Sequence, residues 1–214
     1  MLLRKLLVVG LALSLASCET AYYEALEQIG IPKRDVLIDR IESAQEAQED
    51  GQQQFKDALE QFQAVVNFDG GELQDVYEKL NDEYEDSVDA AATISSRIDS
   101  VESVATALFD EWRDELSEYS NERYRRDSER QLTATERRYE RLLSSMRRAE
   151  SSVNPVLDTL KDNVLYLKHN LNARAIASLK SELGAVNEDV AALVATMQSA
   201  IDESNAFIAE LQQG

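Results

Sequence analysis

Apolar residues recur along most of this chain at alternating spacings of three and four, the pattern of amphipathic α-helices. The first such stripe runs from Leu37 to Val66, and Gln48 and Gly51 weaken it in the middle. It ends at segment 67–71, Asn-Phe-Asp-Gly-Gly, which is typical of a turn between helices. Since Pro32 stands where a helix can begin, the pattern predicts a helix over 33–67.

A single heptad phase then holds over a long stretch that has no glycine or proline. The positions seven apart are Tyr77, Tyr84, Ala91, Ile98, Ala105, Trp112 and Tyr119. Because a loop within this span would reset the phase, we predict one helix over 77–119, about 60 Å long. The phase slips after this span, and segments 128–131 and 133–136 both fit capping boxes. We therefore predict a helix over 72–151 that continues through a stutter, with a break near 128–133 as the alternative.

The last helix is predicted over 155–212. Asn154 can cap it, and Pro155 suits its first turn. One apolar stripe covers 157–171 and a slipped one covers 179–211, which crosses Gly184 in phase. Together the stripes predict an all-α fold, an elongated antiparallel coiled-coil rod of three long helices. The rod forms a single domain over 33–212, with the aromatic residues of the heptad series in its seam.

Composition and charge fit this picture. The 214 residues include only 7 Gly and 2 Pro, too few for the turns of a sheet protein of this size. The formal net charge of −19 argues against a nucleic-acid partner, whose phosphates require a basic surface. With one Cys and one His, the chain offers neither an internal disulfide nor a multi-histidine metal cage.

The N-terminus has the features of an export signal. Arg4 and Lys5 precede an apolar run over 6–16, which is too short to span a bilayer. The following Leu15-Ala16-Ser17-Cys18 resembles a bacterial lipobox. The resemblance implies cleavage after Ser17, a diacylglycerol thioether on Cys18 and acylation of the new amine. Residues 1–17 are then a signal peptide, and 18–32 are a lipidated N-terminus and tether.

Two alternatives to this interpretation stay open. One is an ordinary signal peptide with a free cysteine nearby, and the other is a short anchor that is not cut. If Cys18 is lipidated, its acyl chains would hold the protein on a membrane. Lipoprotein sorting resembles a rule in which Asp after the lipidated Cys retains the protein at the inner membrane. Glu19 stands there, which favours the outer membrane and a chain that faces the periplasm.

Five separate blocks resemble an uncharacterised family of bacterial envelope proteins, domain of unknown function 2959. They are GIPKRDVL at 30–37, VVNFDGG at 65–71, ALFDEW at 107–112, TERRY at 135–139 and LKHNLN at 167–172. The resemblance extends from about Glu24 over the rest of the chain. It implies an exported helical protein of Gram-negative bacteria, and it supplies no activity, substrate or catalytic residue.

Little catalytic chemistry is available in this sequence. His169 is the single candidate base, and its place between Leu167 and Leu171 predicts that it faces solvent. The Glu-x-x-His motif of di-iron bundles does not occur, and the acidic turn 67–72 does not fit the spacing of a calcium loop. We therefore expect no catalytic residue, no metal site and no cofactor.

Charge is distributed unevenly along the chain. Segment 121–150 holds nine arginines and six acidic residues, a local charge of +3 on a strongly acidic protein. The arginines could pair with Glu129, Glu136 and Glu140 along the same helix, or with acidic residues of a packed neighbour. Alternatively, 123–148 is an anion-docking end for phosphates, cell-wall carboxylates or an acidic protein, including a second copy of this chain. The candidates for such docking are Arg125, Arg126, Arg137 and Arg138.

These features predict a non-enzymatic, lipid-anchored envelope protein that acts as a structural or adaptor rod. Its expected partners are the membrane, through lipid on Cys18, and an envelope protein or cell-wall component. The alternative is a periplasmic holdase-like chaperone, which would need a cavity with exposed apolar residues. The continuous stripes do not indicate such a cavity, and an enzyme is the least favoured class.

Overall fold

The computed structural model describes residues 22, 23, 25–70 and 72–213, and each regular element in these ranges is helical. Residues 1–21, which include the predicted signal peptide and Cys18, lie outside the described residues. Helical residues at 22–23 and 25–28 precede five helices. These are α2 (Lys33–Val66), α3 (Leu73–Glu115), α4 (Glu122–Ser151), α5 (Val153–His169) and α6 (Ala173–Gln213).

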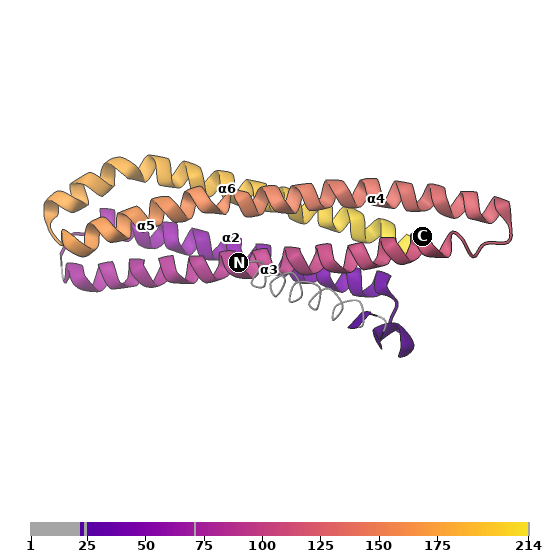
Figure 1. Ribbon diagram of the computed structural model, residues 1–214. Coiled ribbons are helices and arrows are strands. Elements are labelled where there is room, and N and C mark those ends of the chain that lie inside the picture. The colour runs from indigo at the N-terminus through magenta and orange to yellow at the C-terminus, as the bar shows by residue number, and fades with distance from the viewer. Residues whose placement is uncertain (1–21, 24, 71, 214) are drawn as a thin grey trace, which may run out of the picture.

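The predicted all-α, elongated architecture is confirmed (Figure 1). The chain runs along the rod four times, alternately in each direction: α2, then α3, then α4 continued by α5, then α6. α2 packs on α3 and α6, while α4 and α5 pack on the same two helices from the other side. The arrangement is therefore an up-down-up-down four-helix bundle rather than a rod of three helices.

The predicted continuous helix over 72–151 is wrong, because the chain reverses at 116–121 (Figure 1). The turn contains neither glycine nor proline. Asn121 begins the next helix by accepting hydrogen bonds from the backbone N–H groups of Arg123 and Tyr124. No reversal occurs at 128–133, where α4 is regular. Tyr119 keeps the heptad spacing by coincidence, since it lies in the turn with an exposed fraction of 42%.

The predicted boundary at 152–155 is not a reversal either. Ser152 has right-handed helical backbone angles, and its N–H donates to the carbonyl groups of Arg148 and Ala149, so α5 continues in the direction of α4. The reversal that the prediction missed lies at 170–172, inside the predicted helix 155–212. There the side chain of Asn172 accepts from the N–H groups of Arg174 and Ala175 and starts α6.

The first hairpin follows the sequence closely. α2 ends one residue before the predicted boundary, and Gly70 adopts a φ of 151° in the turn. Gln48 and Gly51, the weak points of its stripe, are both buried. A Cβ on Gly51 would lie 2.7 Å from Cδ1 of Ile94 in α3. Gly51 thus allows α2 and α3 to approach closely near the middle of the bundle.

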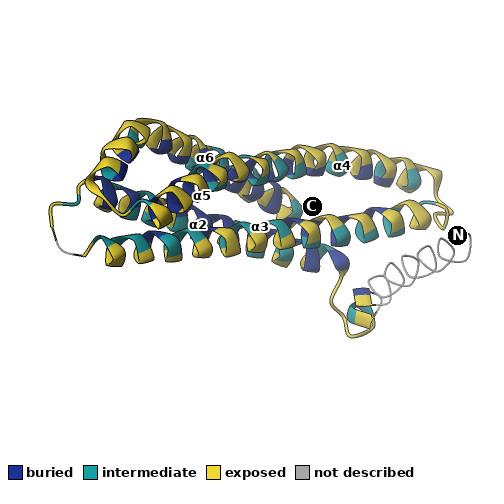
Figure 2. Ribbon diagram, turned by 60° about the vertical axis from the view of Figure 1, so that its left-hand side comes forward, coloured by how far each residue is buried: buried dark blue, intermediate teal, exposed yellow. Residues whose placement is uncertain are grey.

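The four-helix part of the rod ends at an aromatic cluster. Tyr139 of α4 packs edge-on against Phe109 of α3, with ring centroids 5.4 Å apart, and its ring lies 6.3 Å from that of Phe207 near the end of α6. Beyond this cluster α3 and α4 continue together as a hairpin past the ends of α2 and α6 (Figure 1). Buried positions line the inner side of each helix, and exposed positions line the outer sides (Figure 2).

Candidate functional site

A strongly acidic groove runs along the outer side of α3, beside the N-terminal segment and the start of α2. It has a volume of about 890 Å³, and eight of its thirteen lining residues are Asp or Glu. They include Asp110, Asp114, Glu115 and Glu118, which lie toward the α3–α4 turn. We call this feature the acidic groove.

Lys33 closes one side of the acidic groove. It is the first residue of α2, only 5% exposed, and its Nζ lies 2.7 Å from Glu27 Oε2 and 3.0 Å from Glu111 Oε1. Burial acts to lower the pKa of Lys33, but hydrogen bonds to the two carboxylates outweigh it and raise that pKa. The N-terminal segment makes a second contact with α3 through the hydrogen bond of 3.0 Å between Tyr23 Oη and Ser103 Oγ. Together these contacts hold the N-terminal segment against α3.

The pKa of Lys33 is higher in the folded chain than its ordinary value of 10.5. The stabilisation from charged Lys33 is therefore fully present below pH 10.5, and it is lost only as the pH rises through the raised pKa of the folded chain. We call the ion pairs of Lys33 with Glu27 and Glu111 the clasp; they are therefore formed at neutral pH. We expect Lys33→Met to release residues 22–31 from α3, because two partly buried carboxylates would then face each other without a cation. The cost should lie between the ~0–1 kcal/mol of exposed pairs and the ~3–5 kcal/mol of buried ones.

Hydrogen–deuterium exchange checks this, with faster exchange expected in residues 25–31 and unchanged exchange in α5. Lys161→Met, at an exposed position of α5, is the matched control and should leave the N-terminal segment protected. Equal protection in the wild type and Lys33→Met would show that the clasp does not hold this segment.

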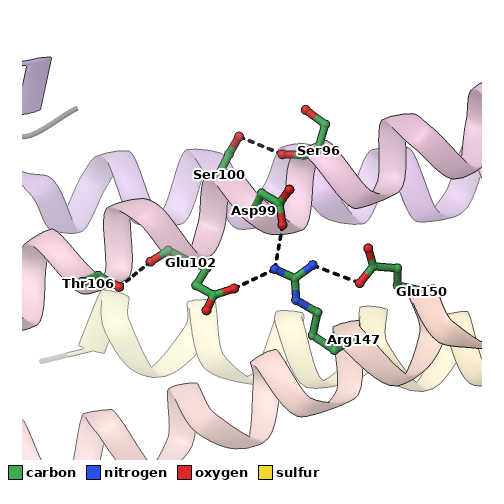
Figure 3. Close-up of polar contacts among 7 residues, drawn as sticks. All are labelled: Ser96, Asp99, Ser100, Glu102, Thr106, Arg147 and Glu150. Carbon is green, nitrogen blue, oxygen red and sulfur yellow. Dashed lines mark hydrogen bonds and ion pairs between the residues drawn. The ribbon is translucent and has the colours of Figure 1, made fainter. Parts of the chain in front are cut away.

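A second charged cluster fixes α4 against α3 (Figure 3). Nη2 of Arg147 lies 2.7 Å from Asp99 Oδ1 and 2.6 Å from Glu102 Oε2, while Nη1 lies 3.0 Å from Glu150 Oε2. Burial acts to lower the pKa of Arg147, but the three carboxylates raise it. One guanidinium thus joins two helices through geometry that only a planar, forked donor provides.

The four arginines predicted for anion docking lie on different sides of α4. Arg125 donates to Glu122 one turn away, and Arg138 pairs with Glu210 of α6 at 3.0 Å. Arg126 and Arg137 face outward instead and line one shallow hollow. Arg126 reaches Glu122 only at 4.0 Å, and no carboxylate of the described residues lies within 4.0 Å of the Arg137 guanidinium. The segment therefore contains both paired and outward-facing arginines.

The other residues singled out by the sequence lie as follows. His169 is exposed at the end of α5, as predicted. Tyr77, Tyr84 and Trp112 are half-buried against the core, whereas Tyr119 is exposed. Within residues 22–213, as far as they are described, three or more His, Cys, Asp or Glu side chains do not gather to hold a metal ion. None of the helices in the same part of the chain is long and apolar enough to cross a bilayer.

Sequence reasoning missed the clasp at Lys33, the cluster at Arg147 and the acidic groove. Each joins residues far apart in the chain, so no local spacing marks it. The one available signal for the groove was the excess of acidic residues over 110–118. In the continuous helix that the sequence predicted, these residues would simply have formed an acidic, solvent-exposed side of the helix.

Comparison with known proteins agrees with the resemblance seen in the five sequence blocks. No curated protein and no solved structure shows significant similarity to this chain. A family model described as a protein of unknown function, DUF2959, matches residues 22–211, which is nearly the whole of the described structure. The chain therefore belongs to the DUF2959 family.

Proposed function

We propose that this protein is a non-enzymatic, lipid-anchored rod of the bacterial envelope, held by lipid on Cys18 and acting as a structural or adaptor protein. The observation that carries the proposal is the N-terminal pattern: a basic start, a short apolar run and the lipobox-like 15–18, four residues before the first described residue. The proposed membrane is the outer one, with the rod on its periplasmic side.

The shape of the rod supports a spacing or adaptor role. The N-terminal segment joins the bundle at Ser103 and Lys33, close to the end that carries the α3–α4 turn. From this level to the opposite end, α3 extends for about 50 Å. A rod anchored at this point would present long helical surfaces at a set distance from the membrane.

The distribution of exposed apolar side chains supports a rod over a holdase-like chaperone. The large ones lie singly or in small groups far apart: Tyr22, Ile29 and Ile31 at the N-terminal segment, Tyr119 and Tyr124 at the α3–α4 turn, Val88 on α3, and Leu165, Tyr166 and Leu171 around the end of α5. A client-binding surface would need a larger continuous apolar patch.

We expect Cys18→Ala to abolish incorporation of labelled fatty acid and to release the protein from the membrane fraction or leave it uncleaved. Glu19→Asp is the matched control, because it keeps the cysteine and should stay labelled while moving toward the inner membrane. Wild-type protein that takes up no labelled fatty acid would refute the lipid anchor. A labelled protein that suppresses aggregation of unfolded clients would favour the chaperone instead.

A further inference from the structure

The outer side of α4 carries a continuous ridge of arginines. Six of them recur at spacings of three, four and seven: Arg123, Arg126, Arg130, Arg137, Arg141 and Arg148. At 3.6 residues per turn this set lies opposite the buried positions of the helix, Ser128, Leu132, Tyr139, Leu142, Met146 and Ala149. The intervening ridge positions are Thr133, Ala134 and Ser144, so no acidic residue shares the ridge. We call this set the arginine ridge.

Pairing within the chain neutralises this ridge only in part. Arg130 pairs with Asp127, and Arg141 reaches Glu203 of α6 at 3.6 Å. Arg123, Arg137 and Arg148 have no carboxylate of the described residues within 4.0 Å, the limit for an ion pair. Like charges at helical spacings of three and four repel each other. A surface of this kind gains most from a partner that supplies carboxylates or phosphates.

The acidic groove on the adjacent helix supplies the opposite charge at the same height along the rod. Ion pairs between α3 and α4 fix this register: Arg113 lies opposite Glu136, and Arg147 lies opposite Asp99 and Glu102. Residues 130–148 of the ridge therefore lie level with residues 101–115 of α3 and 116–119 of the turn that follows it. Within this part of the groove, Asp114, Glu115 and Glu118 form no ion pair among the described residues, so their carboxylates are available.

Asp99 and Glu102 at one end of the groove are already paired with Arg147 of α4, whereas Asp114, Glu115 and Glu118 form no ion pair with the ridge arginines of the same chain among the described residues. The ridge lies on the side of α4 opposite its buried positions, and the groove lies on the side of α3 that carries the N-terminal segment. A parallel neighbour, shifted sideways but not along the rod, would bring its arginine ridge level with this groove.

We propose that copies of this protein associate side by side, with the arginine ridge of one chain seated along the acidic groove of the next. The occupant of the groove is thus a second copy of the chain. Because the ridge and the groove are different surfaces, the contact is heterologous and can repeat, which gives open rows. Rods anchored in one membrane would be parallel and level, as this contact requires. The association itself does not depend on the lipid, since it rests on charges within residues 99–148.

Charge reversal on each surface separately tests the proposal. The ridge variant carries Arg126→Glu, Arg130→Glu and Arg137→Glu, and the groove variant carries Asp114→Lys, Glu115→Lys and Glu118→Lys. Each variant alone should associate at least about tenfold more weakly than the wild type, because like charges then face each other. The control carries Lys161→Glu, Lys168→Glu and Lys180→Glu, which change the net charge as the ridge variant does but at exposed positions on α5 and α6.

Mixing the two variants separates a lost contact from a damaged fold. In the mixture the reversed ridge of one chain meets the reversed groove of the other, and the two unchanged surfaces also match. Association should therefore return to within a few-fold of the wild type. The measurement is sedimentation of the full chain in uncharged detergent, where wild-type assemblies should dissociate as salt rises from 0.1 to 1 M and the Debye length falls from ~10 to ~3 Å.

Any one of four results would overturn the proposal. The wild type could sediment as a single chain at low salt. The ridge variant could associate as strongly as the wild type does. The mixture could fail to restore association although both variants keep the circular dichroism spectrum of the wild type. Binding to vesicles of anionic phospholipid that depends on the ridge, with self-association unchanged, would likewise assign the ridge to the membrane instead of a second copy.

Discussion

Phe55→Ala should destabilise the protein by about 3–5 kcal/mol, the range for removing a buried aromatic ring from a packed core. Phe55 is fully buried in α2. Its neighbours on the same side of the helix, Ala58 and Phe62, are fully buried as well. α2 packs on both α3 and α6, and the helices of a close-packed core can shift only a little to fill a cavity left by the ring.

Urea unfolding followed by circular dichroism measures this loss as a lower midpoint with an unchanged slope. Tyr124→Ala is the control, because Tyr124 is 60% exposed on α4 and its removal should change stability by less than ~0.5 kcal/mol. A loss below ~1 kcal/mol for Phe55→Ala would mean that the four helices do not pack as a single core.

The helical content and elongation of the fold could be read from the sequence because apolar periodicity reports which residues are buried. The stripe in 37–66 predicted α2 to within one residue, and the Asn-Phe-Asp-Gly-Gly turn predicted the first reversal. These signals are local: they depend on the spacing of neighbours and on the backbone preferences of Gly.

The two reversals at 116–121 and 170–172 could not be read in the same way. In both turns an Asn side chain caps the next helix, Asn121 before α4 and Asn172 before α6, and Asn also occurs within helices in this chain. At 116–121 the heptad series of apolar residues continued by chance to Tyr119. The spacing of apolar residues therefore gave no sign that α3 ends at Glu115. At 170–172 the slip between Leu171 and Leu179 was the visible signal, and a slip alone does not distinguish a stutter from a turn.

The candidate surfaces depended on these reversals. A continuous helix over 72–151 would place 110–118 and 123–148 end to end, as an acidic and a basic stretch of one rod. The turn at 116–121 instead folds them side by side at one height. The contrast in charge was thus visible in the sequence, whereas the register that makes the two stretches complementary between copies was not.

Trp112→Ala should open the far end of the α3–α4 hairpin while the four-helix part stays folded. Trp112 is half-buried, and its Nε1 donates a hydrogen bond of 2.8 Å to Ser128 Oγ on the facing helix. Glu111 and Arg138 still pair with Lys33 of α2 and Glu210 of α6. Closer to the turn, α3 and α4 extend past the ends of α2 and α6 (Figure 1), with Leu132 as a further buried apolar residue. A two-helix end with so few buried contacts has a low free energy of opening.

Removing the indole should therefore lower the opening free energy of 112–134 by about 2–3 kcal/mol, from lost apolar burial and one lost hydrogen bond. At 1.4 kcal/mol for each factor of ten, amide exchange in this segment should become about 30- to 150-fold faster. Trp112→Phe keeps a ring without the N–H donor and should cost only ~1 kcal/mol. Exchange in α2 and α6 should not change with either substitution. If α2 and α6 lost protection together with the hairpin, the hairpin would be part of one cooperative unit, and its two-helix end would not be an independent region of low stability.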